Sequence, residues 1–111
     1  MTDITNLSTV NVAISNYIAV VTMNNPPVNA QNRQFHDDLT LAFDVLSDRD
    51  DVRSIVLTGA GKCFSAGADI KGRASQKPNL GDHWGHSRRV RECFYSIMEC
   101  RKPVIAAING A

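Results

Sequence analysis

Residues Leu57–Lys71 read Leu-Thr-Gly-Ala-Gly-Lys-Cys-Phe-Ser-Ala-Gly-Ala-Asp-Ile-Lys. This glycine-rich stretch follows a short apolar run, Ser54–Thr58, which predicts a β-strand covered on both faces. Ligand sites in α/β sheets gather where strands end. The small residues 66–68 would let a ligand approach the main chain, where N–H groups stabilise an oxygen that becomes negative. On this pattern alone, a connecting turn without a ligand is the commoner outcome.

Two phosphate-binding patterns fail in the same stretch. A Walker loop needs glycine where Val56 stands and a hydroxyl residue where Cys63 stands. A dinucleotide-binding fingerprint that begins at Gly59 would need glycine in place of Phe64. The hypothesis that survives uses the backbone of the stretch to bind a ligand.

Upstream of this stretch, the pattern predicts a hairpin and a helix. Val10–Ser15 alternates apolar and polar residues, and Tyr17–Met23 is β-branched and aromatic, which predicts two strands with Ser15-Asn16 at their turn. Asn29 and Asn32 are both candidate N-caps for the helix that follows. Its apolar face is predicted from residues at helical spacing, namely Phe35, Leu39, Ala42, Phe43 and Leu46.

Downstream, Arg73–Gly85 is polar and predicts a mobile loop, followed by a helix over His86–Arg101 and a buried strand over Val104–Ile108. The order β-β-α-β-loop-α-β contains a β-α-β crossover, so the fold class is α/β with parallel strands. A buried strand at the very end of the chain is expected when a fold continues beyond it.

Composition bounds the function. The chain has 111 residues, 43% of them hydrophobic and 21% charged, with a net charge of +1, which suits a single folded domain. The charge and short apolar runs disfavour nucleic-acid and membrane partners. Three cysteines without a C-x-x-C pair predict neither a disulfide framework nor a metal site. With no secretory signal at its start, the chain is expected in the cytoplasm.

Three segments together carry a family resemblance. Lys62–Lys71 closely resembles the first oxyanion-hole segment of the crotonase (enoyl-CoA hydratase/isomerase) superfamily. Asn25–Ala30 is similar to that family's early coenzyme-A loop, and Lys102–Gly110 to the strand that leads to its second oxyanion-hole segment. The segments follow one another in family order, so the resemblance covers nearly the whole chain.

The resemblance implies a crotonase-like ββα spiral fold that binds acyl-CoA thioesters. The backbone N–H of Ala68 would be one of two donors that polarise the thioester carbonyl, and Lys62, Lys71 or Arg73 could meet coenzyme-A phosphates if they are not simply solvated. The remaining substrate-binding residues implied by the family are Val28, Ala30, Ala66, Gly67, Asp69, Ile70 and Lys71.

The resemblance also sets limits. The family's second donor and its acid/base glutamates would follow Ala111, so residues 1–111 are expected to be the N-terminal part of a crotonase domain, inactive alone. The intact protein would be an enoyl-CoA hydratase or isomerase, a homotrimer or hexamer, with coenzyme A only as part of its substrate and no other cofactor. The alternative is a non-catalytic module that binds CoA esters or a partner chain.

Other polar residues have simpler interpretations. Asp69 would oppose a developing anion, so its side chain is expected to cap a turn or short helix. Trp84 could line an acyl pocket, with His83 or His86 as acid or base, but a solvated loop explains all three. His36 is expected on the surface. The three cysteines, Cys63, Cys93 and Cys100, are expected to pack rather than react.

Overall fold

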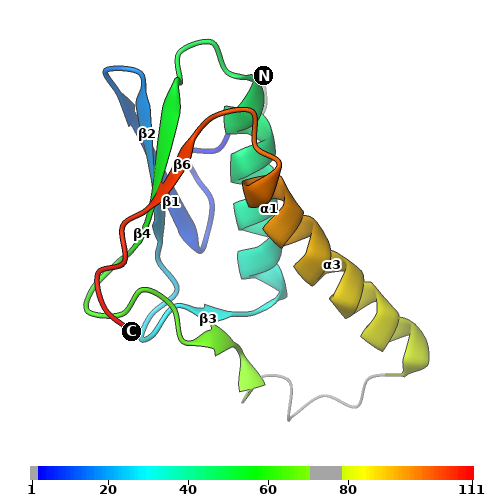
Figure 1. The fold of residues 1–111 in the computed structure, drawn as a ribbon. Coiled ribbons are helices and arrows are strands. Elements are labelled where there is room, and N and C mark those ends of the chain that lie inside the picture. The colour runs from blue at the N-terminus through cyan, green and yellow to red at the C-terminus, as the bar shows by residue number, and fades with distance from the viewer. Residues whose placement is uncertain (1–2, 71–78) are drawn as a thin grey trace.

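A computed structural model describes residues 3–70 and 79–111 of the chain. One sheet and two helices form its body, and a small second sheet lies at one end (Figure 1). The elements, in chain order, are β1 (Val10–Ser15), β2 (Ile18–Met23), β3 (Ala30–Gln31), α1 (Arg33–Asp48), β4 (Ser54–Gly59), β5 (Gly67–Ala68), α3 (Leu80–Met98) and β6 (Val104–Ala106). The predicted α/β class is confirmed.

The first two strands form the predicted antiparallel hairpin, but its turn lies one residue later than expected. Ser15 pairs with Ile18, and the two loop residues, Asn16 and Tyr17, have φ of 53° and 66°. Such left-handed values match the twist of a two-residue hairpin turn. Tyrosine is unusual in this conformation, and Arg53 holds Tyr17 in place. The backbone N–H of Arg53 donates to the Tyr17 carbonyl at 2.7 Å, and the Arg53 guanidinium lies 4.1 Å from the centre of the Tyr17 ring.

The main sheet has the order β1-β2-β4-β6, with β2, β4 and β6 parallel. Both helices lie on one face of it (Figure 1). Buried and partly buried residues alternate along β4, so Ile55 and Leu57 face the helices while Val56 does not. The prediction that this strand is covered on both faces is therefore wrong for the chain as described. The apolar run of β4 had suggested two buried faces, but the helices pack on only one.

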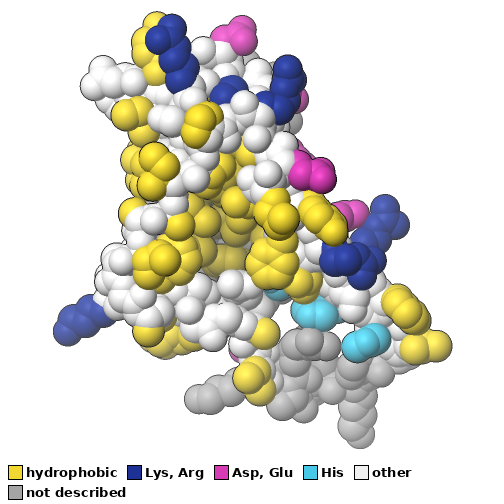
Figure 2. All heavy atoms as spheres, in the orientation of Figure 1, with side chains coloured by type: hydrophobic (Ala, Val, Ile, Leu, Met, Phe, Trp, Pro, Cys, Tyr) yellow, Lys and Arg dark blue, Asp and Glu magenta, His cyan; other side chains and the backbone are white. Residues whose placement is uncertain are grey.

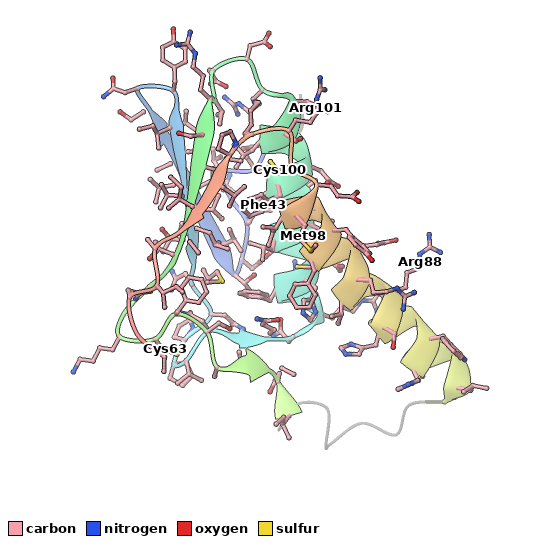
Figure 3. All side chains as sticks on the ribbon, viewed as in Figure 1. Phe43, Cys63, Arg88, Met98, Cys100 and Arg101 are labelled. Carbon is pink, nitrogen blue, oxygen red and sulfur yellow. The ribbon has the colours of Figure 1, made fainter. Side chains whose placement is uncertain are left out.

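Helix α1 packs its apolar face into the core. Asn32 is its N-cap and accepts the Phe35 N–H at 2.9 Å, so the alternative cap, Asn29, is wrong. Phe43 is fully buried and points from α1 toward the sheet (Figure 3). The predicted apolar face is confirmed, because its other members are buried too: Phe35, Leu39, Ala42 and Leu46.

Helix α3 begins and ends earlier than the apolar pattern predicts. Asn79 accepts the Asp82 N–H at 2.8 Å, and the Asp82 carboxylate accepts the Asn79 N–H at 3.2 Å, a reciprocal capping box that starts the helix at Leu80. The first turns are exposed, so they carry no apolar stripe and looked like loop. His83 and Trp84 therefore lie on the helix rather than in the predicted loop. Residues 73–78 of that predicted loop lie outside the described part of the chain.

His36 is buried, which corrects the expectation that it lies on the surface. It is 3% exposed, and its ring centre lies 6.1 Å from that of His86 on α3. Helix α3 packs against the side of α1 that carries His36 and so buries it. The sequence around His36 does not reveal this contact. The predicted last strand is likewise shorter than expected, since β6 ends at Ala106.

Candidate functional site

The two-stranded sheet of β3 and β5 joins the segment that resembles a coenzyme-A loop to the glycine-rich segment. Ala30 pairs with Gly67 and Gln31 with Ala68, in parallel. Immediately before this pairing, the Ala66 N–H donates to the Val28 carbonyl at 2.9 Å. Two-residue strands have no periodicity that a sequence can show, so this contact was not predicted. It brings Val28 and Ala30 beside residues 66–70, so the substrate-binding residues implied by the family resemblance form two walls that lie side by side.

The Ala68 N–H points away from β3. The next N–H, that of Asp69, donates to the Gln31 carbonyl at 3.1 Å, and successive N–H groups of an extended strand point to opposite sides. Ala68 is exposed, and Gly67 before it has φ +82° with open space around its α-carbon. A polar ligand atom could therefore reach the Ala68 N–H without meeting a side chain at position 67.

Asn29 forms an interior link between these walls. Its side chain is buried, at 2% exposed, and its φ is 54°. The amide Nδ2 donates to three carbonyl oxygens of the glycine-rich loop, those of Ala60 at 3.2 Å, Cys63 at 2.9 Å and Phe64 at 3.2 Å. The Oδ1 atom accepts the Asn25 N–H at 2.9 Å. From the sequence, Asn29 was a candidate helix cap within the segment that resembles a coenzyme-A loop, and nothing local in the sequence predicts its role as an interior link.

Asn109 binds the backbone where the same loop begins. Its Oδ1 accepts the Gly59 N–H at 3.1 Å, and its Nδ2 donates to the carbonyls of Gly59 at 2.8 Å and Gly61 at 3.0 Å. The C-terminal residues run beside the loop that follows β4 (Figure 1), and the Phe64 N–H donates to the Ala111 carbonyl at 2.6 Å.

Ser65 links the loop to α1 through a chain of hydrogen bonds. Its hydroxyl donates to the Asn29 carbonyl at 2.7 Å and accepts the Gly67 N–H at 3.2 Å. Gln31 donates its amide to the same hydroxyl at 3.2 Å, and its Oε1 lies 3.3 Å from His36 Nε2. Since Oε1 only accepts, His36 carries its proton on Nε2. Its Nδ1 is buried without a partner among the described residues, and burial, with the nearby charge of His86, lowers the pKa of His36.

The remaining predicted residues fall into three groups. Val28 and Ile70 are 41% and 77% exposed, and both flank the paired strands. Lys71 and Arg73 lie outside the described residues, so their expected contacts stay predictions. Trp84, at 63% exposed, lies on the N-terminal half of α3.

A separate open groove of about 530 Å³ lies between α1 and α3. Asp44 lies in it, and burial, with the charges of Asp48 and Glu92, raises the pKa of this carboxyl. The groove is unsuited to an acyl chain because its lining is mostly polar: Thr40, Asp44, Ser47, Glu92, Tyr95, Ser96, Glu99 and Cys100.

Apolar surface gathers instead in the hollow between the sheet and α3 (Figure 2). Large apolar side chains of α3 and the C-terminal segment are exposed, namely Phe94, Met98, Ile105 and Ile108. Within residues 3–70 and 79–111, no three metal-ligating side chains come together, and no helix is long and apolar enough to cross a membrane.

Comparison with known proteins decides the family. The family model for enoyl-CoA hydratase/isomerase matches residues 13–111. The chain belongs to the enoyl-CoA hydratase/isomerase family. It is 37% identical over 105 residues to a probable enoyl-CoA hydratase of Bacillus subtilis, and 36% identical over 104 residues to the mitochondrial Δ(3,5)-Δ(2,4)-dienoyl-CoA isomerase of Mus musculus.

Solved structures of this family share the fold. An enoyl-CoA hydratase/isomerase from Xanthobacter autotrophicus superposes with a TM-score of 0.88 at 27% identity, covering 95% of this chain and 40% of that one. The chain likewise covers 40% of the Bacillus subtilis protein and 32% of the mouse protein, while 95% and 85% of its own length is matched. The predicted crotonase-like fold, in its N-terminal portion, is confirmed.

Proposed function

We propose that the β3–β5 strip binds the thioester of an acyl-CoA and that the Ala68 N–H donates to its carbonyl oxygen. The observation that carries this proposal is the pairing of Gln31 with Ala68, which turns the Ala68 N–H outward at an exposed edge. A donor held in place before the reaction stabilises an enolate oxygen without reorganisation, an effect of about 3 kcal/mol per donor.

The rest of the strip suits the coenzyme. Val28 and Ala30 would form one wall, and Ala66, Gly67, Asp69, Ile70 and Lys71 the other. Small residues and exposed backbone let a pantetheine chain lie close to the strands. In a longer protein, residues that follow Ala111 would supply the second donor and the carboxylates that move protons. The positions of those carboxylates would then decide whether the enzyme hydrates an enoyl-CoA or moves its double bond.

The whole protein is proposed to be a homotrimer or hexamer in the cytoplasm, with an acyl-CoA as its substrate and no further cofactor. The alternative, a non-catalytic module that binds CoA esters, would use the same strip. The enzyme and the binding module differ in turnover, because a binding module does not convert crotonyl-CoA even as the full-length protein.

The test uses butyryl-CoA labelled with ¹³C at its thioester carbonyl, an unreactive probe. On binding, the carbonyl resonance is expected to move downfield, as it does when the oxygen accepts a hydrogen bond. Ala68→Pro removes the N–H and should abolish that shift. Ala68→Ser is the matched control, since it keeps the N–H and should keep the shift. An unchanged shift in the proline variant would show that Ala68 is not the donor.

A further inference from the structure

The loop between β4 and β5 has no regular secondary structure. The proposed function nevertheless requires the Ala68 N–H, in the strand that follows the loop, to be held at a fixed position. Seven residues, 60–66, separate the two strands. Without a repeating hydrogen-bond pattern, the backbone groups of this loop need partners from elsewhere, because buried carbonyls left unpaired are costly.

Two asparagine side chains meet that need. Asn29 Nδ2 lies within 3.2 Å of the carbonyl oxygens of Ala60, Cys63 and Phe64. Asn109 binds both backbone groups of Gly59 and the carbonyl of Gly61. The two side chains thus reach the loop from the segment before β3 and from the segment after β6.

We propose that Asn29 and Asn109 are positioning residues, which together clamp the loop so that the Ala68 donor is held in place. This inference rests on the proposed function of Ala68. Neither asparagine is assigned a contact with the substrate. Their effect on catalysis passes through the loop backbone.

Asparagine suits position 29 for two reasons. Its backbone has φ 54°, a left-handed conformation that asparagine, aspartate and glycine tolerate better than other residues. Its side chain must also donate to several carbonyls while accepting the Asn25 N–H, which suits an amide because it has two N–H donors beside an acceptor oxygen. Aspartate keeps the size and the acceptor but replaces the donor with a second acceptor, which repels the three carbonyls.

The test compares Asn29→Asp with Asn29→Gly, Asn109→Asp and the control Asn11→Asp. Glycine at position 29 keeps the left-handed backbone and removes only the side chain, so it separates the lost donor from backbone strain. Asn11 is exposed on β1, which β2 separates from β4, so its variant adds the same charge without altering either clamp position.

Two measurements are made on the 111-residue chain. Amide hydrogen exchange at Phe64 and Ala66 reports how firmly the loop is held. The ¹³C shift of labelled butyryl-CoA, followed together with its Kd, reports the alignment of the Ala68 donor. Exchange at the loop amides should rise about tenfold or more in all three clamp variants, with the strand amides and Asn11→Asp close to the unsubstituted chain.

In the clamp variants the bound carbonyl shift should fall by more than half even at saturating butyryl-CoA, because the donor is misaligned. A purely structural role would weaken binding and leave the shift of the bound probe unchanged, which would overturn the inference. So would loop exchange within about twofold of the control in Asn29→Gly. If the unsubstituted chain shows no carbonyl shift, the proposed function fails instead, and exchange alone then decides whether the clamp exists.

Discussion

Gly59→Ala is expected to dislodge the glycine-rich loop from the end of β4. A methyl group at this position would lie 2.5 Å from the Cys63 carbonyl oxygen, 2.6 Å from that of Phe64 and 2.8 Å from the Phe64 α-carbon. All three atoms belong to the backbone, so no side chain can rotate away. The loop would have to retreat by about 1 Å to reach ordinary contact distance.

That retreat also strains the hydrogen bonds of Asn29, which end on the same two carbonyls. Overpacking commonly costs about 1–3 kcal/mol, and a buried polar group that loses its partner costs about as much again. We therefore expect Gly59→Ala to lower the free energy of unfolding by about 2–6 kcal/mol. Urea unfolding followed by circular dichroism measures this directly.

Gly61→Ala is the matched control. Its φ of +77° makes alanine unfavourable, but nothing lies within 4 Å of the added methyl group. Its cost should stay near the ordinary penalty for a left-handed alanine, about 1 kcal/mol. If Gly59→Ala were no more destabilising than Gly61→Ala, the close packing of the loop on β4 would be refuted.

Two further predictions concern buried titratable groups. Since burial lowers the pKa of His36, folding favours its neutral ring, so its stabilisation is complete above the ordinary histidine value of 6.5 and is lost as the pH falls toward the lowered value. Urea unfolding at about pH 7.5 and about pH 5 should show this loss, and His36→Phe should reduce it, whereas His83→Phe on the exposed turn should not. Burial also raises the pKa of the Cys93 thiol to about 11, so iodoacetamide at neutral pH should alkylate the more exposed Cys63 and Cys100 well before Cys93. Peptide mass mapping checks the order, and early modification of Cys93 in the folded chain would contradict it.

Local patterns predicted those elements that have a clear period or a compact apolar run. The first hairpin strand alternates, α1 has apolar residues at helical spacing, and the second hairpin strand and β4 are short apolar runs; each element lies close to its predicted bounds. Helix α3 was placed too late, because its first turns from Leu80 are exposed and a capping box rather than an apolar stripe starts them. The burial of His36 was missed because it depends on a second helix 50 residues away in the chain, at His86.

The candidate site likewise has features that the local sequence predicts and others that only the fold shows. The small residues around Gly67 are visible in the sequence, and their motif identifies the family. Asn29 is visible too, but its local context fits a helix cap as well as an interior link. Only its partners, at separations of 31, 34 and 35 residues along the chain, distinguish the two.

The sequence by itself therefore determined the α/β class, the main strands and first helix, the family and the segment that carries Ala68. Periodicity and short motifs suffice for these because they depend on neighbouring residues. The tertiary structure decided that β5 pairs with β3, that the Ala68 N–H turns outward, and that Asn29 and Asn109 hold the loop behind it. Those features depend on hydrogen bonds between backbone and side-chain groups up to 50 residues apart, and such bonds form only when the chain has folded.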